Sequence, residues 1–375
     1  MKALHILGTR GVPAAHGGFE TFAEHLSLYL VQRGWKVTVY CQELGLGPLY
    51  EDEWQGVRRV CIPVAGDGPA STMLFDWKSI LHAARAGALC LTLGYNTALF
   101  CAVLRLARVP NIINMDGIEW RRGKWSLPAR AWFWLNDWGG CWIGNHLVAD
   151  HPEIARHLET RVAARKITTI AYGADRLPNT ALSEGDAATV VHGLGLEPGN
   201  YLTLVARPEP ENSILEVVAG FSRQPRGMRL AVLGRYDPAH AYHRAVQAAA
   251  GPEVQFLGAI YDKPVVQALR LHAAAYVHGH QVGGTNPSLV EALGAGNAVL
   301  AHDNRFNRWV LGDGGRYFAG ADGFAEEVEA LVADPALRER MRLASRARFD
   351  SAFTWDAILA AYEALLEQWA LKARA

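Results

Sequence analysis

The chain has no excess of charge of either sign, because its 37 Lys and Arg residues are matched by 37 Asp and Glu residues. A neutral chain has no overall field that attracts nucleic acid. We therefore expect no nucleic-acid partner. If the ligand carries phosphate, local features of the chain have to bind it.

Cysteine pairs and long apolar runs are also missing. The cysteines are odd in number and form no CxxC pair, which argues against a disulfide framework and a cysteine zinc site. The 14 histidines form no HExxH motif, so we expect no metal. No run of about 18 apolar residues occurs, and the opening MKALHILGTRG lacks the apolar stretch of a signal peptide. These features predict a cytoplasmic protein. The five cysteines are Cys41, Cys61, Cys90, Cys101 and Cys141.

Short apolar runs alternate with longer segments of helical period, which is typical of parallel α/β sheets. In the first half the expected strands are Leu4–Leu7, Val37–Cys41, Arg59–Val64, Ala88–Leu93, Asn111–Met115, Trp142–Ala149 and Lys166–Ile170. The expected helices between them are Gly18–Arg33, Ser71–Ala86, Thr97–Ala107 and Leu127–Gly139.

The alternation pauses in the polar, Gly-rich stretch 181–200 and restarts afterwards. The pause predicts two domains, an N-terminal one over residues 1–177 and a C-terminal one over residues 178–354. The last segment, 355–375, is expected to form a helix that packs back on the first domain. The strands expected after the pause are Tyr201–Ala206, Arg229–Leu233, Val254–Leu257, Ala275–His278 and Ala298–Ala301.

The turn after the first strand, GTRGVPAAHGGFE, is rich in glycine and leads into a helix that Gly17 and Gly18 open. Glycines allow close approach of a ligand, and the free amides of a helix N-terminus favour an anion. The turn matches neither GxGxxG nor a Walker loop, so motifs for NAD and ATP are not met. A loop that needs glycine only to turn remains an alternative.

Arg207 directly follows the first strand of the second domain. Residues at that end of a strand face the region where open α/β sheets bind ligands. The guanidinium fork suits a diphosphate. A surface ion pair with Glu209 or Glu211 remains the alternative.

The stretch HGHQVGGTNPSLVEALG, residues 278–294, places a Gly-rich turn between a strand and a helix that begins near Pro287. Glu291 lies one turn inside this helix, where its carboxylate can accept hydrogen bonds from a vicinal diol such as a ribose. The alternative is an ordinary capping loop with a solvated Glu.

A further candidate site is the polar motif NMDGIEWRRGK, which follows another strand of the first domain. Asp116 in this motif is placed to orient or activate an acceptor hydroxyl. An ion-pair cluster with the neighbouring Arg and Lys residues explains the motif equally well.

Six tryptophans fall within segment 120–142, next to several Arg and Lys residues. Trp and basic residues together suit a membrane interface, but Trp is also a large core residue. We expect peripheral membrane contact through only a few of them. They are Trp120, Trp125, Trp132, Trp134, Trp138 and Trp142.

Taken in order, the motifs GTRGVPAAHGGFE, NMDGIEW, VARPEPEN and GGTNPSLVEALGAG resemble those of the retaining GT-B glycosyltransferases of glycosyltransferase family 4. More narrowly, they resemble the bacterial rhamnosyltransferase-like branch that acts in cell-surface polysaccharide assembly. The resemblance implies an α/β chain of GT-B fold, with two Rossmann-like domains facing each other across a cleft. It also implies work at the inner face of the cell membrane.

The resemblance further implies site residues. Asp116 and Arg207 would be catalytic, and no metal would be needed, because Arg and helix dipoles neutralise the leaving diphosphate. The donor nucleotide-sugar would be bound by Gly17, Gly18, Arg207, Asn212, Gly284, Thr285, Asn286, Ser288, Leu289 and Glu291. Apart from the resemblance, we expect the acceptor side to be formed by Glu20, Tyr95, Asn96, Glu119 and Arg121.

Two positions depart from the family pattern. Gly283 stands where many members have a glutamate that binds the donor sugar, and Asn212 stands where many have a lysine. The missing glutamate favours a 6-deoxyhexose, so we expect transfer of L-rhamnose from dTDP-L-rhamnose, with retention, to a lipid-linked or glycan hydroxyl. The alternatives are a UDP- or GDP-sugar donor, a catalytically silent nucleotide-sugar-binding protein and a GT-B epimerase.

Overall fold

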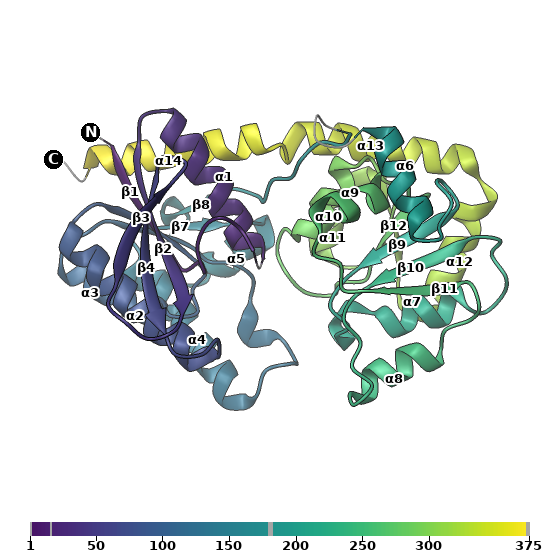
Figure 1. The fold of residues 1–375 in the computed structure, drawn as a ribbon, viewed down its shortest axis with the longest axis horizontal. Helices are drawn as coiled ribbons and strands as arrows, with labels where there is room; N and C mark the ends of the chain where they lie inside the picture. Colours follow the sequence, from purple (N-terminus) through teal and green to yellow (C-terminus); the bar gives the residue numbers. More distant parts are fainter. Residues whose placement is uncertain (1, 16, 179–182, 373–375) are drawn as a thin grey trace. The chain divides into compact units, whose positions relative to one another are not determined.

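The computed structural model of the chain describes residues 2–15, 17–178 and 183–372. The chain forms two compact units, which we call unit 1 (Met1–Tyr172 with Trp355–Ala375) and unit 2 (Gly173–Thr354). The sequence placed the join a few residues later, after residue 177. Each unit contains a largely parallel β-sheet covered by helices (Figure 1), which confirms the predicted α/β class with two Rossmann-like domains.

The sheet of unit 1 has eight strands in the order β3-β4-β2-β1-β5-β6-β7-β8. Every neighbouring pair is parallel except β3 and β4, which form an antiparallel hairpin at the edge. The strands are β1 (Ala3–Leu7), β2 (Lys36–Leu44), β3 (Tyr50–Trp54), β4 (Val57–Val64), β5 (Leu89–Leu93), β6 (Asn111–Asn114), β7 (His146–Ala149) and β8 (Ile167–Thr169).

Parallel strands need crossover connections, and in unit 1 most of these contain helices that cover the faces of the sheet, whereas β2 and β4 are joined through β3. The side chains of β1 point to both faces of the sheet. Leu4 packs in the core under α1, whereas Leu7 packs in the core under α2. The helices are α1 (Gly18–Gln32), α2 (Pro69–Ala86), α3 (Ala102–Leu106), α4 (Leu127–Ile143) and α5 (Pro152–Glu159), with short 3-10 helices η1 (Ala98–Cys101), η2 (Glu119–Arg121) and η3 (Ala164–Lys166).

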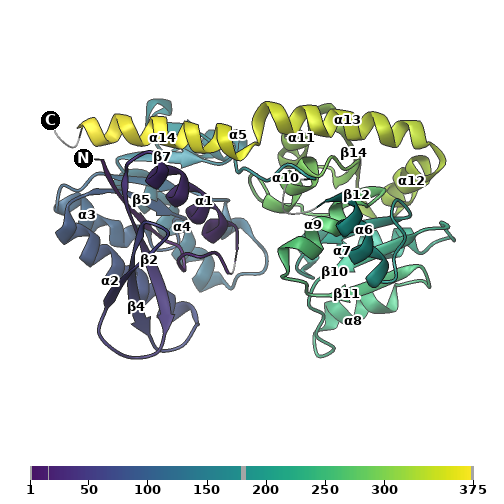
Figure 2. The ribbon, with the colours of Figure 1, turned by 45° about the horizontal axis from the view of Figure 1, so that its top comes forward.

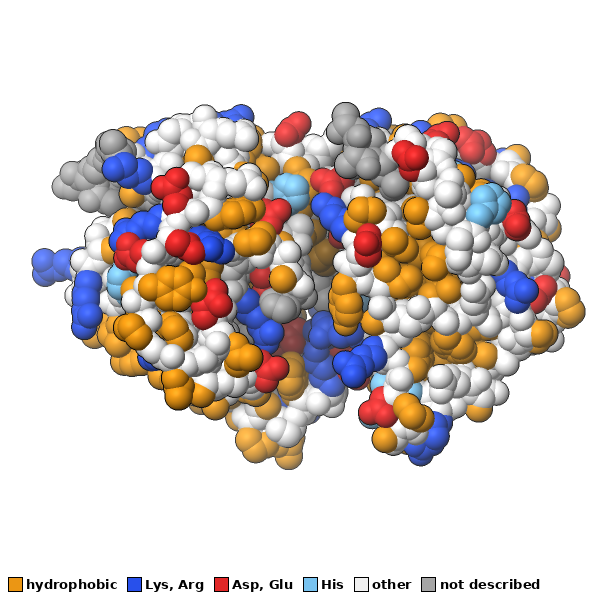
Figure 3. All heavy atoms as spheres, viewed as in Figure 1, with side chains coloured by type: hydrophobic (Ala, Val, Ile, Leu, Met, Phe, Trp, Pro, Cys, Tyr) orange, Lys and Arg blue, Asp and Glu red, His pale blue; other side chains and the backbone are white. Residues whose placement is uncertain are grey.

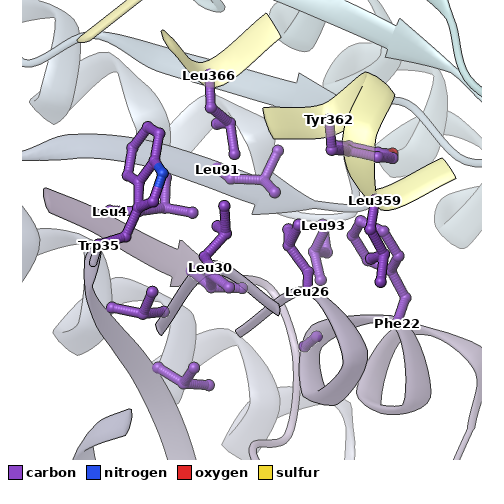
Figure 4. Packing of buried hydrophobic residues seen from close by; sticks show 14 of the residues in the cluster. Leu4, Phe22, Leu26, Leu30, Trp35, Leu91, Leu93, Leu359, Tyr362 and Leu366 are labelled. Atoms are coloured by element: carbon purple, nitrogen blue, oxygen red, sulfur yellow. The ribbon is translucent and has the colours of Figure 1, made fainter. Parts of the chain in front are cut away.

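The C-terminal helix α14 (Trp355–Lys372) belongs to unit 1 and lies alongside α1, as Figures 1 and 2 both show. Its buried residues Leu359, Tyr362 and Leu366 share one core cluster with Phe22 and Leu26 of α1 (Figure 4). This packing confirms the prediction that the last helix returns to the first domain.

The sheet of unit 2 has six strands, all parallel, in the order β11-β10-β9-β12-β13-β14. The strands are β9 (Tyr201–Val205), β10 (Arg229–Leu233), β11 (Val254–Gly258), β12 (Ala275–His278), β13 (Val299–His302) and β14 (Gly315–Phe318). The helices are α6 (Glu184–Gly193), α7 (Ile214–Phe221), α8 (Ala241–Ala248), α9 (Lys263–Leu271), α10 (Pro287–Gly294), α11 (Arg305–Leu311), α12 (Gly320–Ala333) and α13 (Pro335–Ala352), with 3-10 helices η4 (Pro210–Asn212) and η5 (Gly312–Gly314).

Two expectations about single elements were wrong. The stretch that looked like a polar pause contains α6, because Ser183 caps it by accepting from the Asp186 amide at 3.2 Å, and Ala187 and Val191 are buried. The strand expected from Trp142 begins only at His146, because α4 continues to Ile143. The edge strands β3 and β14 were not expected at all.

Replacing Leu366 by Ala tests how strongly unit 1 depends on α14. Leu366 is fully buried, so Leu366→Ala removes apolar contacts and leaves a cavity, and we expect it to lower the free energy of unfolding by about 2–5 kcal/mol. Leu371→Ala, on the same helix but 68% exposed, is the matched control and should change it by less than about 0.5 kcal/mol. Chemical denaturation measures both; equal effects would show that α14 is not held by this core.

Candidate functional site

The predicted polar residues of unit 1 follow three neighbouring strands, β1, β5 and β6. These strands are parallel, so their carboxyl ends lie at one edge of the sheet. A direct contact joins two of the loops, because the amide of Glu119 donates to the hydroxyl of Tyr95 at 2.8 Å. The structure therefore brings the predicted residues after β5 and β6 together.

The glycines after β1 have different uses. Gly8 has φ +75°, and a Cβ there would collide with the carbonyl of Leu93, so the backbone conformation and the close packing both require glycine at this position. Gly17, in contrast, is exposed and caps α1, and Gly18 is the first residue of the helix. The first helical hydrogen bond is donated by Thr21 to Gly17, so the amides of Gly18 and the next two residues precede the helical ladder. They form an anion-favouring terminus.

Glu20, expected on the acceptor side, is instead mostly buried at 8% exposure. Its Oε1 accepts from the amide of Arg10 at 3.3 Å, and a Cβ on Gly17 would lie 3.2 Å from its Oε2. One turn further on, Glu24 accepts from the amide of Ala14 at 2.6 Å. Both carboxylates hold the loop after β1 in place. In the described structure Glu20 therefore binds the backbone of its own unit.

Asp116 lies two residues after β6 in a left-handed conformation, φ +52°, which few residue types adopt easily. Its amide donates to Oδ1 of Asn114 at 3.0 Å, while Nδ2 of Asn114 donates to the hydroxyl of Tyr362 on α14 at 2.9 Å. Desolvation and the negative charge of Glu119 raise the pKa of Asp116 to about 6. The C-terminal helix thus helps to shape the loop that carries this carboxyl group.

Glu119 and Tyr95 are already engaged inside unit 1. The Glu119 carboxylate accepts from Arg122 at 2.6 Å and from the indole of Trp125 at 3.0 Å, so the ion-pair interpretation of this motif holds for Glu119. Tyr95 is 1% exposed, and burial raises the pKa of its hydroxyl. Both residues support the loop rather than facing solvent.

The other two acceptor-side candidates are more open. The Asn96 side chain is exposed, while its carbonyl accepts from the indole of Trp132 at 2.8 Å. Arg121 is exposed and its guanidinium lies 5.0 Å from the centre of the Trp120 ring. These two side chains are free to meet a ligand.

A buried polar cluster behind these loops was missed from the sequence. Asp137, on α4, is 2% exposed and accepts from the indole of Trp120 at 2.7 Å. The same carboxylate oxygen pairs with Arg161 at 2.8 Å and contacts Nε2 of His157 at 3.1 Å. The available signal was that Asp137 is the one acidic residue in the Trp-rich sequence of α4. The cluster fixes the segment after Asp116 to α4 and α5.

In unit 2, Arg207 follows β9 at the carboxyl edge of the sheet and is exposed. Within the described part of the chain it pairs with no acidic side chain, so the expected alternatives of a bond to Glu209 or Glu211 are not observed. Its carbonyl accepts from the amide of Glu209 at 2.7 Å and from the Asn212 side chain at 2.8 Å. The loop is therefore braced while the guanidinium stays available.

Asn212, expected to bind the donor, is 3% exposed and turned into this loop. The loop after β12 comes so close that a Cβ on Gly279 would collide with the Asn212 carbonyl. Gln281 joins the same two loops, donating from its amide to the Glu211 carbonyl and from its side chain to Ser213, both at 2.9 Å. In the described structure Asn212 has a shaping role.

The Gly-rich turn before α10 ends in an Asn cap. Oδ1 of Asn286 accepts from the amide and the hydroxyl of Ser288 at 3.1 and 2.9 Å, and the Leu289 amide donates to the Asn286 carbonyl at 3.1 Å. The amides of Ser288 and Leu289, expected to meet the donor, thus have partners within the turn, and the Leu289 side chain is fully buried. Gly284 is half-buried and Thr285 is 3% exposed.

Glu291 lies on the first turns of α10 and keeps 38% of its side chain exposed. Its Oε2 pairs with Arg270 of α9 at 2.6 Å, and the Arg270 side chain is only 5% exposed. A buried cation therefore orients a partly exposed carboxylate, which suits recognition of a diol by the remaining oxygen.

Two histidines at the end of β12 stack on each other, with ring centres 4.3 Å apart. His278 is 1% exposed, and desolvation lowers its pKa, so its ring is neutral near pH 7. The carbonyl of His280 accepts from the side chains of Asn304 at 3.0 Å and Asn307 at 2.9 Å. In the residues that the structure describes, no three metal-ligating side chains come together here or elsewhere.

Two protein families match the chain, one in each unit. Residues 1–175 match the family described as a domain of unknown function, DUF1972, and residues 197–348 match Glycosyl transferases group 1. A comparison with curated proteins gave no match.

Solved structures with the same fold extend over the whole chain. Sucrose-phosphate synthase from Thermosynechococcus elongatus is 18% identical, with a TM-score of 0.80 and full coverage of both chains. Anabaena Alr3699/HepE, solved with UDP and glucose, is 14% identical with a TM-score of 0.76 over 98% of this chain and 99% of its own. The trehalose 6-phosphate synthase of Burkholderia multivorans is 11% identical with a TM-score of 0.72, over 99% of both chains. These likenesses show the fold and confirm that it is GT-B.

Removing the charge of Asp137 tests the buried cluster. Asp137→Asn leaves Arg161 buried at 4% side-chain exposure without its counter-charge, so we expect the free energy of unfolding to fall by about 3–5 kcal/mol. Asp303→Asn breaks an exposed pair with Arg308 and, as a control, should cost less than about 1 kcal/mol. Denaturation curves compare the two; a small effect of Asp137→Asn would mean that water reaches the cluster.

Proposed function

We propose that this chain, a glycosyltransferase of GT-B fold with a group 1 domain, transfers L-rhamnose from dTDP-L-rhamnose to a lipid-linked or glycan hydroxyl. In this proposal unit 2 binds the nucleotide-sugar and unit 1 binds the acceptor. The reaction retains the configuration at the anomeric carbon and serves the assembly of a cell-surface polysaccharide.

The observation that carries the proposal is the pair of charged groups at the carboxyl edge of the unit 2 sheet. Strands β9 and β12 are neighbours, so the loop of Arg207 and the turn that leads to Glu291 lie at the same edge. Arg207 is exposed and unpaired among the described residues, while Glu291 is held by Arg270 with part of its carboxylate exposed. A free guanidinium for a diphosphate and an oriented carboxylate for a ribose are what a nucleotide-sugar requires.

In the proposed chemistry the bond between the anomeric carbon and the diphosphate oxygen breaks, and the acceptor hydroxyl forms the new bond on the same face. Arg207 stabilises the charge that develops on the leaving diphosphate. The leaving diphosphate takes the proton of the acceptor hydroxyl, while Asp116 orients that hydroxyl. The polar reaction needs no metal in this scheme.

The donor sugar is the least constrained part of the proposal. Gly283, with φ +143°, presents no side chain to hydroxyl groups of the sugar, which favours a 6-deoxyhexose. The Anabaena structure contains UDP and glucose, so a UDP-sugar is the second candidate donor. A catalytically silent nucleotide-sugar-binding protein is the alternative of another class, and the exposed, unpaired Arg207 weighs against it.

Thermal stability with dTDP, UDP, GDP, ADP and NAD, each at one concentration, separates these candidates. A ligand at about a hundred times its dissociation constant stabilises the native state by roughly 2.7 kcal/mol, a readily measured shift. Selective stabilisation by dTDP supports the rhamnosyl donor. Selective stabilisation by UDP or GDP keeps the transferase and replaces the donor, and selective stabilisation by NAD contradicts the proposal.

Arg207→Ala should impair use of the donor while leaving the fold intact. Hydrogen bonds to a charged group contribute about 1.5–3 kcal/mol, so we expect kcat/KM for the nucleotide-sugar to fall roughly ten- to hundredfold. Arg340→Ala, which removes an exposed Arg from α13, is the control and should have no effect on kinetics. Unchanged kinetics in Arg207→Ala would remove this residue from the site.

Asp116→Asn should lower kcat and alter its pH dependence. With the pKa raised to about 6, the carboxylate is protonated as the pH falls through 6, and we expect the wild-type rate to fall with it. Asn tolerates the left-handed backbone of this position, so the variant should fold.

The direction of the pKa shift of Asp116 predicts how Asp116→Asn affects stability, and this provides a control for the variant. The folded pKa lies above the unfolded value, so stability from this group is present at low pH and is lost as the pH rises through about 6. Asp116→Asn therefore should not destabilise the protein at pH 7 through lost charge. If the variant keeps both the wild-type rate and its acid limb, Asp116 has no role in transfer.

A further inference from the structure

We propose that the outer face of α4 in unit 1 docks on a lipid bilayer that contains anionic lipids. The proposal rests on the proposed function for its purpose, which is access to a lipid-linked acceptor. Its evidence is independent and comes from the side chains of α4 and its neighbours. None of the helices in the described chain is long and apolar enough to cross a bilayer, so the contact would be peripheral.

The structure divides the six tryptophans of segment 120–142 into two groups. Three donate their indole N–H inside unit 1: Trp120 to Asp137, Trp125 to Glu119 and Trp132 to the Asn96 carbonyl, at 2.7, 3.0 and 2.8 Å. These three have internal roles.

The other three, Trp134, Trp138 and Trp142, are spaced four residues apart and form a ladder along one side of α4. Their ring centres are 6.2 and 5.2 Å apart. Trp134 is 44% and Trp142 is 62% exposed. The middle ring, Trp138, is half-buried and lies 4.7 Å from the guanidinium of Arg161, whereas Trp134 and Trp142 at the two ends of the ladder face solvent.

Further apolar side chains extend this surface. Leu127 and Leu135 of α4 are 77% and 49% exposed, and Leu106 at the end of α3 is 84% exposed. Of the fourteen large hydrophobic side chains that are exposed in the described chain, twelve belong to unit 1, and five of these twelve are on α3 or α4. On the face seen in Figure 3, hydrophobic side chains (orange) lie exposed over the region of unit 1 that Figure 1 labels α2, α3 and α4.

The exposed charges of the stretch 98–148, which contains α3 and α4, are all basic. The stretch 98–148 contains three acidic residues, Asp116, Glu119 and Asp137, and none of them is exposed. The same stretch contains six Lys and Arg residues, of which four are exposed: Arg105, Arg108, Arg121 and Lys124.

Basic groups also reach the C-terminal end of the ladder. The Lys166 ammonium donates to the carbonyl of Cys141 at 2.7 Å, next to Trp142. Desolvation and the charge of Arg105 lower the pKa of Lys166, which shows that Arg105 lies within electrostatic reach of it. Cations thus accompany the exposed indoles.

The exposed indoles and leucines together with the nearby basic residues favour a single kind of partner for this surface. Indoles and leucines on a helix with basic residues at both ends suit the interface of a bilayer with anionic headgroups. A second copy of the same surface is a poor partner, because two cationic patches would face each other.

Flotation with vesicles of phosphatidylcholine, with and without phosphatidylglycerol, tests the surface in the full-length protein. We expect the wild type to float with vesicles that contain phosphatidylglycerol, and less as salt is raised. Trp134→Ser with Trp142→Ser should weaken binding at least tenfold. Tyr261→Ser with Leu343→Ser removes two comparably exposed side chains of unit 2 and, as the matched control, should bind like the wild type.

Thermal melting shows whether the tryptophan variant folds. If it does not, Arg105→Gln with Arg108→Gln provides the second test, because both residues are exposed; it should lose only the part of binding that depends on phosphatidylglycerol. Wild-type protein that stays in the soluble fraction with both vesicles overturns the proposal. The proposal is also overturned if the wild type is a dimer and the tryptophan variant is a monomer, because the surface would then be an interface between two copies of the chain.

Failure of this proposal is distinguishable from failure of the proposed function. Stabilisation by dTDP and transfer to a water-soluble acceptor do not involve the α4 face and should persist in the tryptophan variant. Transfer without flotation would leave the function and remove the surface. Flotation that depends on the tryptophans, with no transfer from any donor, would support the α4 surface and contradict the proposed function.

Discussion

Parallel strand pairing is the constraint on which both units depend. Parallel neighbours can be joined only by crossovers, which place helices on the two faces and all carboxyl ends at one edge. In unit 1 this edge collects the loops after β1, β5 and β6, and in unit 2 the corresponding edge of the other sheet collects the loops after β9 and β12. Asp116 and Arg207 each follow a strand at the carboxyl edge of their own sheet, so the same rule accounts for the position of each residue within its unit.

Asparagine amides then fix the shape of the loops at these edges. Asn114 donates to Tyr362 and accepts from the Asp116 amide, Asn212 closes the Arg207 loop, and Asn286 caps α10. An amide both donates and accepts, so one buried side chain can satisfy a loop that lacks regular hydrogen bonds. Because the asparagines supply these hydrogen bonds, the guanidinium of Arg207 is not needed to hold its loop in place. Glu20 and Glu119 show the opposite case, since their carboxylates do the bracing themselves.

The sequence predicts strands with buried, continuous apolar runs, such as β1 and β12, because burial on both faces leaves a clear pattern. It fails for β3, whose edge position exposes polar residues, and for α6, whose few buried residues resemble a loop. For the candidate site it predicts that the polar loops lie at the carboxyl edge of each sheet, because each loop follows a parallel strand. It does not reveal that Asn212 turns inward or that Asp137 binds Trp120, since such contacts depend on the three-dimensional placement of distant residues.

The neutral total charge conceals a difference between the units. Unit 1 has 20 Lys and Arg residues against 17 Asp and Glu, whereas unit 2 has 17 against 20. The unit proposed to bind a diphosphate is therefore the acidic one, and its overall field opposes the ligand. Recognition of the proposed diphosphate there has to come from groups in direct contact. Within the described residues Arg207 forms no ion pair, so no internal carboxylate neutralises its charge. In unit 1 the stretch 98–148 has four exposed cations and no exposed acidic residue, and such a distributed field suits the anionic membrane that we propose as its partner.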